Sequence, residues 1–127
     1  MGGNQCIQKG QGWRLGWNPD AEEYKALMGG EEWSVELTAT EFNLFCQSVQ
    51  QLSETMKSLV TKLMEEEMVS CELETEYLWM EVEGFPDAFR LSFILNQGRR
   101  VEGGWSASIT SELIKGLARI QRFRVEN

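Results

Sequence analysis

An amphipathic segment from Thr38 to about Glu67 constrains the fold most, because its start signal, period and length all indicate one long α-helix. Thr38 and Glu41 have the spacing of a capping box, so the segment predicts a helix over about 39–67. Apolar residues recur at every third or fourth position and form one stripe: Phe42, Phe45, Val49, Leu52, Met56, Leu59 and Leu63. We therefore expect a helix with one buried face, with Leu52 near its middle.

The length of this helix relative to the domain predicts self-association. A chain of 127 residues forms one domain with a diameter of roughly 35 Å, whereas about 29 helical residues extend roughly 43 Å. The helix would overhang the domain and expose Leu63, Met64 and Met68. Because a second subunit is the usual cover for such a surface, we expect a homodimer or larger homo-oligomer with these residues at the contact.

Composition is typical of a globular chain. Apolar residues make up 42% of the sequence and charged residues 25%, and no apolar run is long enough for a transmembrane span or a signal-peptide core. We expect one cytosolic domain, 1–127, with 1–10 as a flexible tail. Cys6, Cys46 and Cys71 lack C-x-x-C spacing, so we interpret them as reduced thiols, with Cys46 buried at the edge of the helix stripe.

Alternating apolar residues predict three strands before the long helix. Trp13, Leu15 and Trp17 alternate with smaller or charged residues, and similar patterns occur near 24–28 and 33–37. Short turn segments separate the three strands. This part of the chain therefore predicts an antiparallel meander.

The segment after the long helix predicts a second meander. We expect a long strand over about 70–83, whose apolar parity changes near Glu76 and implies either a bulge or a strand covered on both faces. A turn at 84–87 and further strands up to Trp105 follow, and then a helix over about 109–123. The fold class is therefore α+β, with two antiparallel β-meanders each followed by a helix.

Three strings of this sequence resemble a small cyanobacterial protein family of unknown function. They are Gly-Trp-Arg-Leu-Gly-Trp-Asn-Pro at 12–19, Trp-Ser-Val-Glu-Leu-Thr at 33–38 and Phe-Ile-Leu-Asn-Gln-Gly-Arg-Arg-Val-Glu-Gly-Gly-Trp at 93–105. The resemblance covers nearly the whole chain. It implies a Whirly-like fold, similar to single-stranded-DNA-binding transcriptional regulators, and no enzymatic activity. The basic Lys-Gly-Lys-Ala-Ala-Leu string of the Whirly proteins has no counterpart here, so the resemblance assigns no DNA-binding residue.

Charge is unevenly distributed along the chain, whose formal net charge is −8. Residues 1–83 contain 16 acidic and 5 basic residues, whereas residues 84–127 contain 4 acidic and 7 basic residues. The stretch 65–83 is rich in glutamate and has no lysine or arginine, so it repels phosphate. We expect the arginines of the C-terminal part to neutralise Glu65, Glu66 and Glu67.

The residue types that are absent exclude most catalytic sites. The sequence has no histidine, which removes Ser-His-Asp and Cys-His arrangements and His-containing zinc sites. Its paired glycines lack the context of a P-loop or dinucleotide-binding motif. Glu72, Glu74 and Glu76 would be spaced roughly 7 Å apart along a strand face, too far apart for one cation. We expect a non-enzymatic protein without metal or cofactor.

Two functions remain. The first is a binding or assembly module with an unknown protein partner, supported by the acidic surface, the helix overhang and an uncharged outer helix face over 43–53. The same features equally suit self-association. We favour protein contacts over nucleic acid because of the net charge.

The second function is single-stranded nucleic-acid binding through aromatic stacking beside arginines. The candidate contacts are Trp13, Arg14, Trp17, Arg90, Arg99, Arg100 and Trp105, with Trp79 as a further stacking residue. Aromatic residues on a sheet belong more often to the core, and the charge of the chain opposes phosphate.

Overall fold

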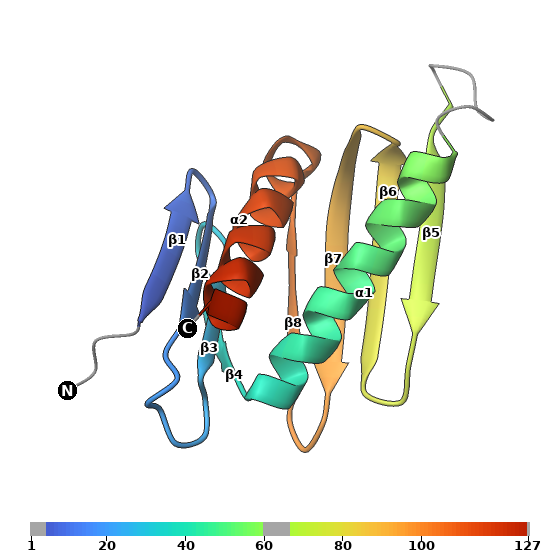
Figure 1. Cartoon of the computed structure of the whole chain (residues 1–127). Coiled ribbons are helices and arrows are strands. Elements are labelled where there is room, and N and C mark those ends of the chain that lie inside the picture. The colour runs from blue at the N-terminus through green and yellow to red at the C-terminus, as the bar shows by residue number, and fades with distance from the viewer. Residues whose placement is uncertain (1–4, 60–66, 127) are drawn as a thin grey trace.

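The structure, a computed structural model, describes residues 5–59 and 67–126 and arranges them as two sheets and two helices (Figure 1). In chain order the elements are β1 (Cys6–Gly10), β2 (Trp13–Trp17), β3 (Ala26–Gly29), β4 (Ser34–Leu37), α1 (Ala39–Ser58), β5 (Val69–Glu74), β6 (Leu78–Phe85), β7 (Ala88–Asn96), β8 (Arg100–Trp105) and α2 (Ala107–Glu126).

Each sheet is a four-stranded antiparallel meander in which sequence neighbours pair. The first has the order β1-β2-β3-β4 and the second β5-β6-β7-β8. A helix follows each sheet. This arrangement confirms the predicted α+β class with two meanders each followed by a helix.

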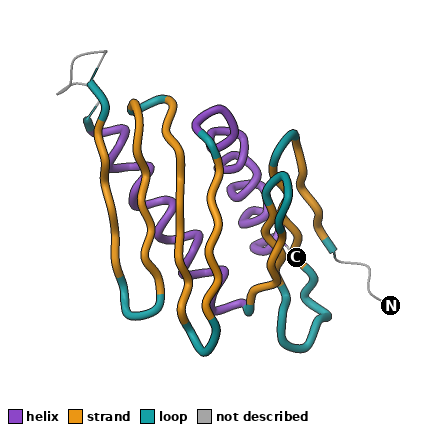
Figure 2. Tube along the Cα trace, turned by 180° about the vertical axis from the view of Figure 1, so that it is seen from behind, coloured by secondary structure: helices purple, strands orange, loops and turns teal. Residues whose placement is uncertain are grey.

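Both helices lie on one side of the sheets, and the opposite side of β5–β8 has no helix over it (Figure 2). Although α1 follows the first sheet, it packs on β5 and β6 of the second. Helix α2 packs on β7 and also on β1 and β2, so it joins the two sheets. No helix in the described part of the chain is long and apolar enough to cross a membrane.

The core lies between the helices and the sheets, and an aromatic cluster occupies the junction of the two sheets. The Phe93 ring contacts those of Phe45, Trp105 and Trp33, with ring centroids 5.2, 5.8 and 6.0 Å apart. The indole N–H of Trp105 donates to the carbonyl oxygen of Gly29 in the first sheet at 3.1 Å. Each aromatic side chain removes a large apolar area from water, so this cluster stabilises the contact between the sheets.

The start of α1 confirms the predicted capping box. The Glu41 N–H donates to Thr38 Oγ1 at 3.1 Å, and the Thr38 N–H donates to Glu41 Oε1 at 2.9 Å. Glu41 is only 3% exposed, and Arg99 compensates its buried charge by donating from Nη2 to Oε1 at 2.8 Å. The same Nη2 donates to the carbonyl oxygen of Glu36 at 2.7 Å. Because Arg99 lies in the turn between β7 and β8, these bonds connect that turn to the start of α1.

The predicted end of the long helix is wrong. Helix α1 ends at Ser58 with Leu59 as its C-cap, and its 20 residues extend about 30 Å, which removes the argument for an overhang. Apolar periodicity continues past Ser58, whereas three consecutive glutamates at 65–67 oppose the helix dipole. Of the predicted oligomer contacts, Leu63 and Met64 lie outside the described residues, and Met68 is 63% exposed.

The prediction of a flexible tail over residues 1–10 is also wrong for its second half. Residues 6–10 form β1, which pairs with β2 in a register that places Cys6 opposite Trp17 and Gly10 opposite Trp13. Gly12 has a φ of 82° in the connecting turn, a conformation that glycine adopts without steric cost. The sequence of β1 has no apolar alternation that would predict a strand. Its backbone pairing with β2 and its packing against α2 hold it in place.

The single strand predicted over 70–83 is two strands joined by a turn. Thr75 closes the turn, since its Oγ1 accepts from the Leu78 N–H at 3.1 Å. Antiparallel pairing places Leu73 opposite Met80, so residues of opposite parity share the face beneath α1. The change of parity near Glu76 therefore marks a reversal of the chain and neither a bulge nor a doubly covered strand.

Candidate binding site

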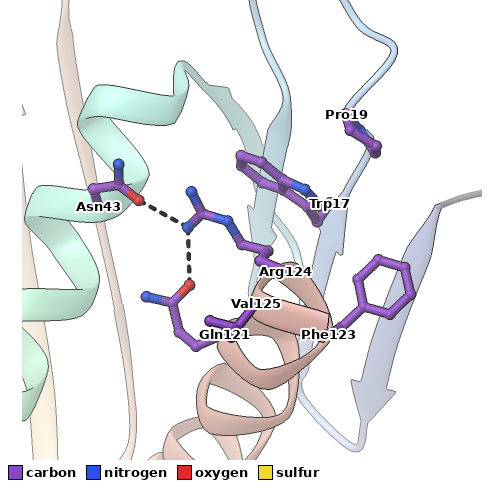
Figure 3. Close-up of a pocket in the computed structure, with 7 residues that line it drawn as sticks. All are labelled: Trp17, Pro19, Asn43, Gln121, Phe123, Arg124 and Val125. Carbon is purple, nitrogen blue, oxygen red and sulfur yellow. Dashed lines mark hydrogen bonds between the residues drawn. The ribbon is translucent and has the colours of Figure 1, made fainter. Parts of the chain in front are cut away.

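A cavity of about 500 Å³ opens where the end of α2 meets β2 and the start of α1. We call it the Arg124 cavity, and its lining residues are Trp17, Pro19, Asn43, Gln121, Phe123, Arg124 and Val125 (Figure 3). Trp17 is the last residue of β2 and faces the helices because it shares the inward parity of Trp13 and Leu15. The apolar face of α2 packs on the sheets, which brings its last turn over this ring.

The guanidinium of Arg124 is fixed in the cavity by an aromatic face and two amide oxygens. Its Cζ lies 3.9 Å from the centroid of the Trp17 ring and 5.7 Å from that of Phe42. Nη1 donates to Asn43 Oδ1 and to Gln121 Oε1, both at 2.8 Å (Figure 3). These contacts join α1, α2 and β2 around one cation and orient its plane.

Unlike Arg90, Arg99 and Arg100, Arg124 has no carboxylate paired with it among the described side chains. Partial burial lowers the pKa of Arg124, an effect opposed by the nearby Cys46 thiol. The guanidinium still remains charged at neutral pH, since its ordinary pKa is above 12. A partly desolvated cation whose hydrogen-bonding partners are neutral attracts an anion.

Cys46 lies close to this cation but is not poised as a nucleophile. Its side chain is 8% exposed, and burial raises the pKa of the thiol from 9.0 to about 12, although Arg124 opposes the shift. A thiol reacts as its thiolate, which is scarce at neutral pH under these conditions. The interpretation of Cys46 as a core residue is confirmed.

We expect the three thiols to react with dithiodipyridine at different rates at pH 8. Cys6 and Cys71 are half-buried and free, whereas Cys46 must be exposed and ionised first, so it should react in a separate slow phase. Because the pKa of its thiol is about 12 in the folded chain, the slow phase should quicken as the pH rises. Cys46→Ala should abolish that phase alone. Three equal rates would contradict the burial of Cys46.

The structure does not bring together the residues predicted to contact nucleic acid. Trp13, Trp17 and Trp105 are 5%, 9% and 4% exposed, and they face the core, so the prediction that they stack on bases is wrong. Trp13 lies against the position of Gly116 in α2. Arg14 is exposed, but it lies on the opposite face of β2 from both neighbouring tryptophans.

Three of the four predicted arginines, Arg90, Arg99 and Arg100, form ion pairs with glutamates of the same chain. Arg90 pairs with Glu83 at 2.7 Å and Glu81 at 3.4 Å, and Arg100 pairs with Glu102 at 2.8 Å. Arg99 binds Glu41, as described above. The predicted neutralisation of residues 65–67 stays a prediction, because 65 and 66 lie outside the described residues.

The outer face of the second sheet, the face away from the helices, is acidic. Trp79 lies on this face, and its indole N–H donates to Glu72 Oε2 at 3.3 Å, while Glu74 is its cross-strand partner. Glu72, Glu74 and Glu76 are exposed, as expected for a solvated strand face. No group of three or more cysteine, aspartate or glutamate side chains in the described ranges is placed to hold a metal ion.

Sequence reasoning missed the main residues of the Arg124 cavity: Asn43, Gln121 and Arg124. The sequence pattern places Asn43 only on an uncharged helix face over 43–53, and Arg124 only among the arginines of the C-terminal part. A weak signal was present, because Arg124 falls next to the inward stripe of α2, four residues after the buried Ile120.

Comparison with known proteins identifies a family and a fold. A crystal structure of a protein with unknown function from the DUF155 family from Prochlorococcus sp. NATL2A is similar to this chain, with a TM-score of 0.86 and 25% sequence identity over 91% of this chain and 97% of that chain. No curated protein matches the chain. Residues 8–120 match the family described as domain of unknown function (DUF1818). The chain therefore belongs to the DUF1818 family, which agrees with the expected resemblance to a family of unknown function.

Proposed function

We propose that this protein is a non-enzymatic cytosolic binding module that acts through contacts with another protein, and that the Arg124 cavity is its contact point. The observation that carries the proposal is the guanidinium of Arg124, held rigidly by Trp17, Asn43 and Gln121 without a carboxylate partner in the described chain. A rigid cation with an aromatic partner loses little conformational entropy when it binds.

The surroundings of the cavity support a protein partner. Arginine and tryptophan are enriched among the residues that dominate binding energy at protein interfaces. Val125, at the rim, is 87% exposed, and the neighbouring α1 presents the exposed, uncharged side chains of Gln47 and Gln50. Uncharged polar and apolar groups are cheaper to desolvate than ionised ones, which suits a contact surface.

Affinity capture from cell extract with two matched variants tests this proposal. Arg124→Leu removes the cation, whereas Arg122→Leu makes the same charge change at an exposed position of α2. We expect a partner that binds the wild type and the Arg122 variant, and that loses about tenfold or more of its affinity for Arg124→Leu when the purified pair is measured by calorimetry. Equal affinity for all three proteins would contradict the proposal.

Single-stranded nucleic-acid binding is the alternative, and one feature supports it. Lys9 and Arg14 lie opposite each other on the outer face of the first sheet, and neither has a carboxylate partner in the described ranges. Such a pair attracts phosphate. Against it are the net charge of −8 and the burial of Trp13, Trp17 and Trp105.

We expect affinity for single-stranded oligonucleotides no better than about 10⁻⁴ to 10⁻⁶ M at physiological salt, because few counterions would be released. Fluorescence anisotropy of a labelled strand across a salt series measures this. Nanomolar binding that weakens steeply with salt, and that is lost in the double variant Lys9→Ala/Arg14→Ala, would favour the alternative.

Self-association remains part of the proposal, although the overhang no longer supports it. The exposed Met68 and Ile7, 63% and 67% exposed, are apolar side chains that a second copy would cover. Light scattering at micromolar concentration should give at least twice the chain mass of 14.6 kDa. A mass equal to that of one chain would leave binding of a different protein as the whole function.

A further inference from the structure

We infer that the Arg124 cavity binds a carboxylate group that a partner protein presents next to an apolar side chain. This inference rests on the proposed protein-binding function and specifies the chemistry that the contact recognises. The donors of Arg124, the walls of the cavity and its single charge each support it.

The first support is the unused hydrogen-bonding edge of the guanidinium. Arginine has five N–H donors, and Nη1 uses its two in the bonds to Asn43 and Gln121. Nε and Nη2 have no bonded partner among the described residues, and these two atoms form one edge of the planar group. A carboxylate accepts two parallel hydrogen bonds from such an edge, which gives the strongest geometry available to this side chain.

The second support is the chemistry of the cavity walls. Trp17, Pro19, Phe123 and Val125 line the space beside the guanidinium. Trp17 covers one face of the cation and partly excludes water, so a charge-assisted hydrogen bond is stronger there than at an open surface. The apolar walls can receive one apolar side chain of a peptide, which a free inorganic anion lacks.

The third support is the charge of the site. Arg124 is the one cation among the described residues that line the cavity, so its charge compensates that of a monoanion. A phosphate group carries up to two negative charges and would leave one of them unpaired in a protein of net charge −8. A carboxylate therefore fits better than a phosphate.

Two sources supply a carboxylate in a protein, the chain terminus and an aspartate or glutamate side chain. Three N-acetylated peptides distinguish these two sources of carboxylate. They are acetyl-Ala-Ala-Leu with a free terminal carboxylate, the same peptide as its amide, and acetyl-Ala-Glu-Leu-amide. Each is titrated into the full chain by calorimetry. We expect one of the two carboxylate peptides to bind about tenfold or more tightly than the uncharged amide, and the tighter one identifies the source.

Two variants test whether this preference depends on Arg124. Arg124→Leu should abolish the preference, and Arg122→Leu should retain it. The comparison of the carboxylate peptides with the amide peptide uses the wild-type protein alone. It therefore tests the inference even if Arg124→Leu folds poorly.

The outcomes separate this inference from the proposed function. If neither carboxylate peptide binds better than the amide to the wild type, the inference is wrong, even where Arg124→Leu still loses its protein partner. If the carboxylate preference is found but partner capture is unaffected by Arg124→Leu, the carboxylate site stands and the protein-binding proposal fails.

Discussion

Phe93→Ala is expected to lower the free energy of unfolding by about 3 to 5 kcal/mol, since it empties the centre of the core. Phe93 is 1% exposed, and its ring contacts α1 through Phe45 and the junction of the two sheets through Trp33 and Trp105. These neighbours belong to elements with their own packing, so they cannot all close around the lost ring. Urea denaturation followed by circular dichroism measures the loss.

The neighbouring Ile94 supplies a matched control. It follows Phe93 in β7 but points to the outer face of the sheet, where it is half-buried. Ile94→Ala removes less buried area and should cost clearly less than Phe93→Ala. Equal losses for the two variants would contradict the assignment of inner and outer faces in β7.

Leu52→Ala is expected to lower the free energy of unfolding by about 2 to 5 kcal/mol through lost burial and a residual cavity. Leu52 is 4% exposed in the middle of α1, where the helix packs on the second sheet. Gln51 is exposed on the same helix, and Gln51→Ala should change the stability by no more than about 0.5 kcal/mol. Equal denaturation midpoints for these two variants would contradict the buried face of α1.

The sequence was sufficient to predict the core and the start of α1 because local signals determine both. The apolar period places Leu52 on the buried face, and the capping box at Thr38 and Glu41 lies within four consecutive residues. The predicted ends and turns depended on interactions across the fold. Strand β1 exists because β2 and α2 hold it, and the turn at Thr75 was hidden in a continuous alternating pattern.

The prediction of a nucleic-acid site was wrong because side chains alternate between the two faces of a strand. Trp13 and Arg14 are adjacent in β2, so their side chains point to opposite faces, and no single surface contains both. Alternation shows that a strand has two faces but not which one the helices cover. The Arg124 cavity was unpredictable for a different reason, since Trp17, Asn43 and Arg124 meet only through the packing of three elements.

Heteronuclear NMR of the Arg124 side chain tests the central claim most directly. The Nε–Hε signal of Arg124, assigned by its loss in Arg124→Lys, is followed while the captured partner protein is added to the ¹⁵N-labelled chain. We predict a large shift of this signal at stoichiometric partner, with the signal of Arg122 unchanged, because Nε lies on the edge that receives the carboxylate. Formation of the complex with the Arg124 signal unmoved would contradict the account.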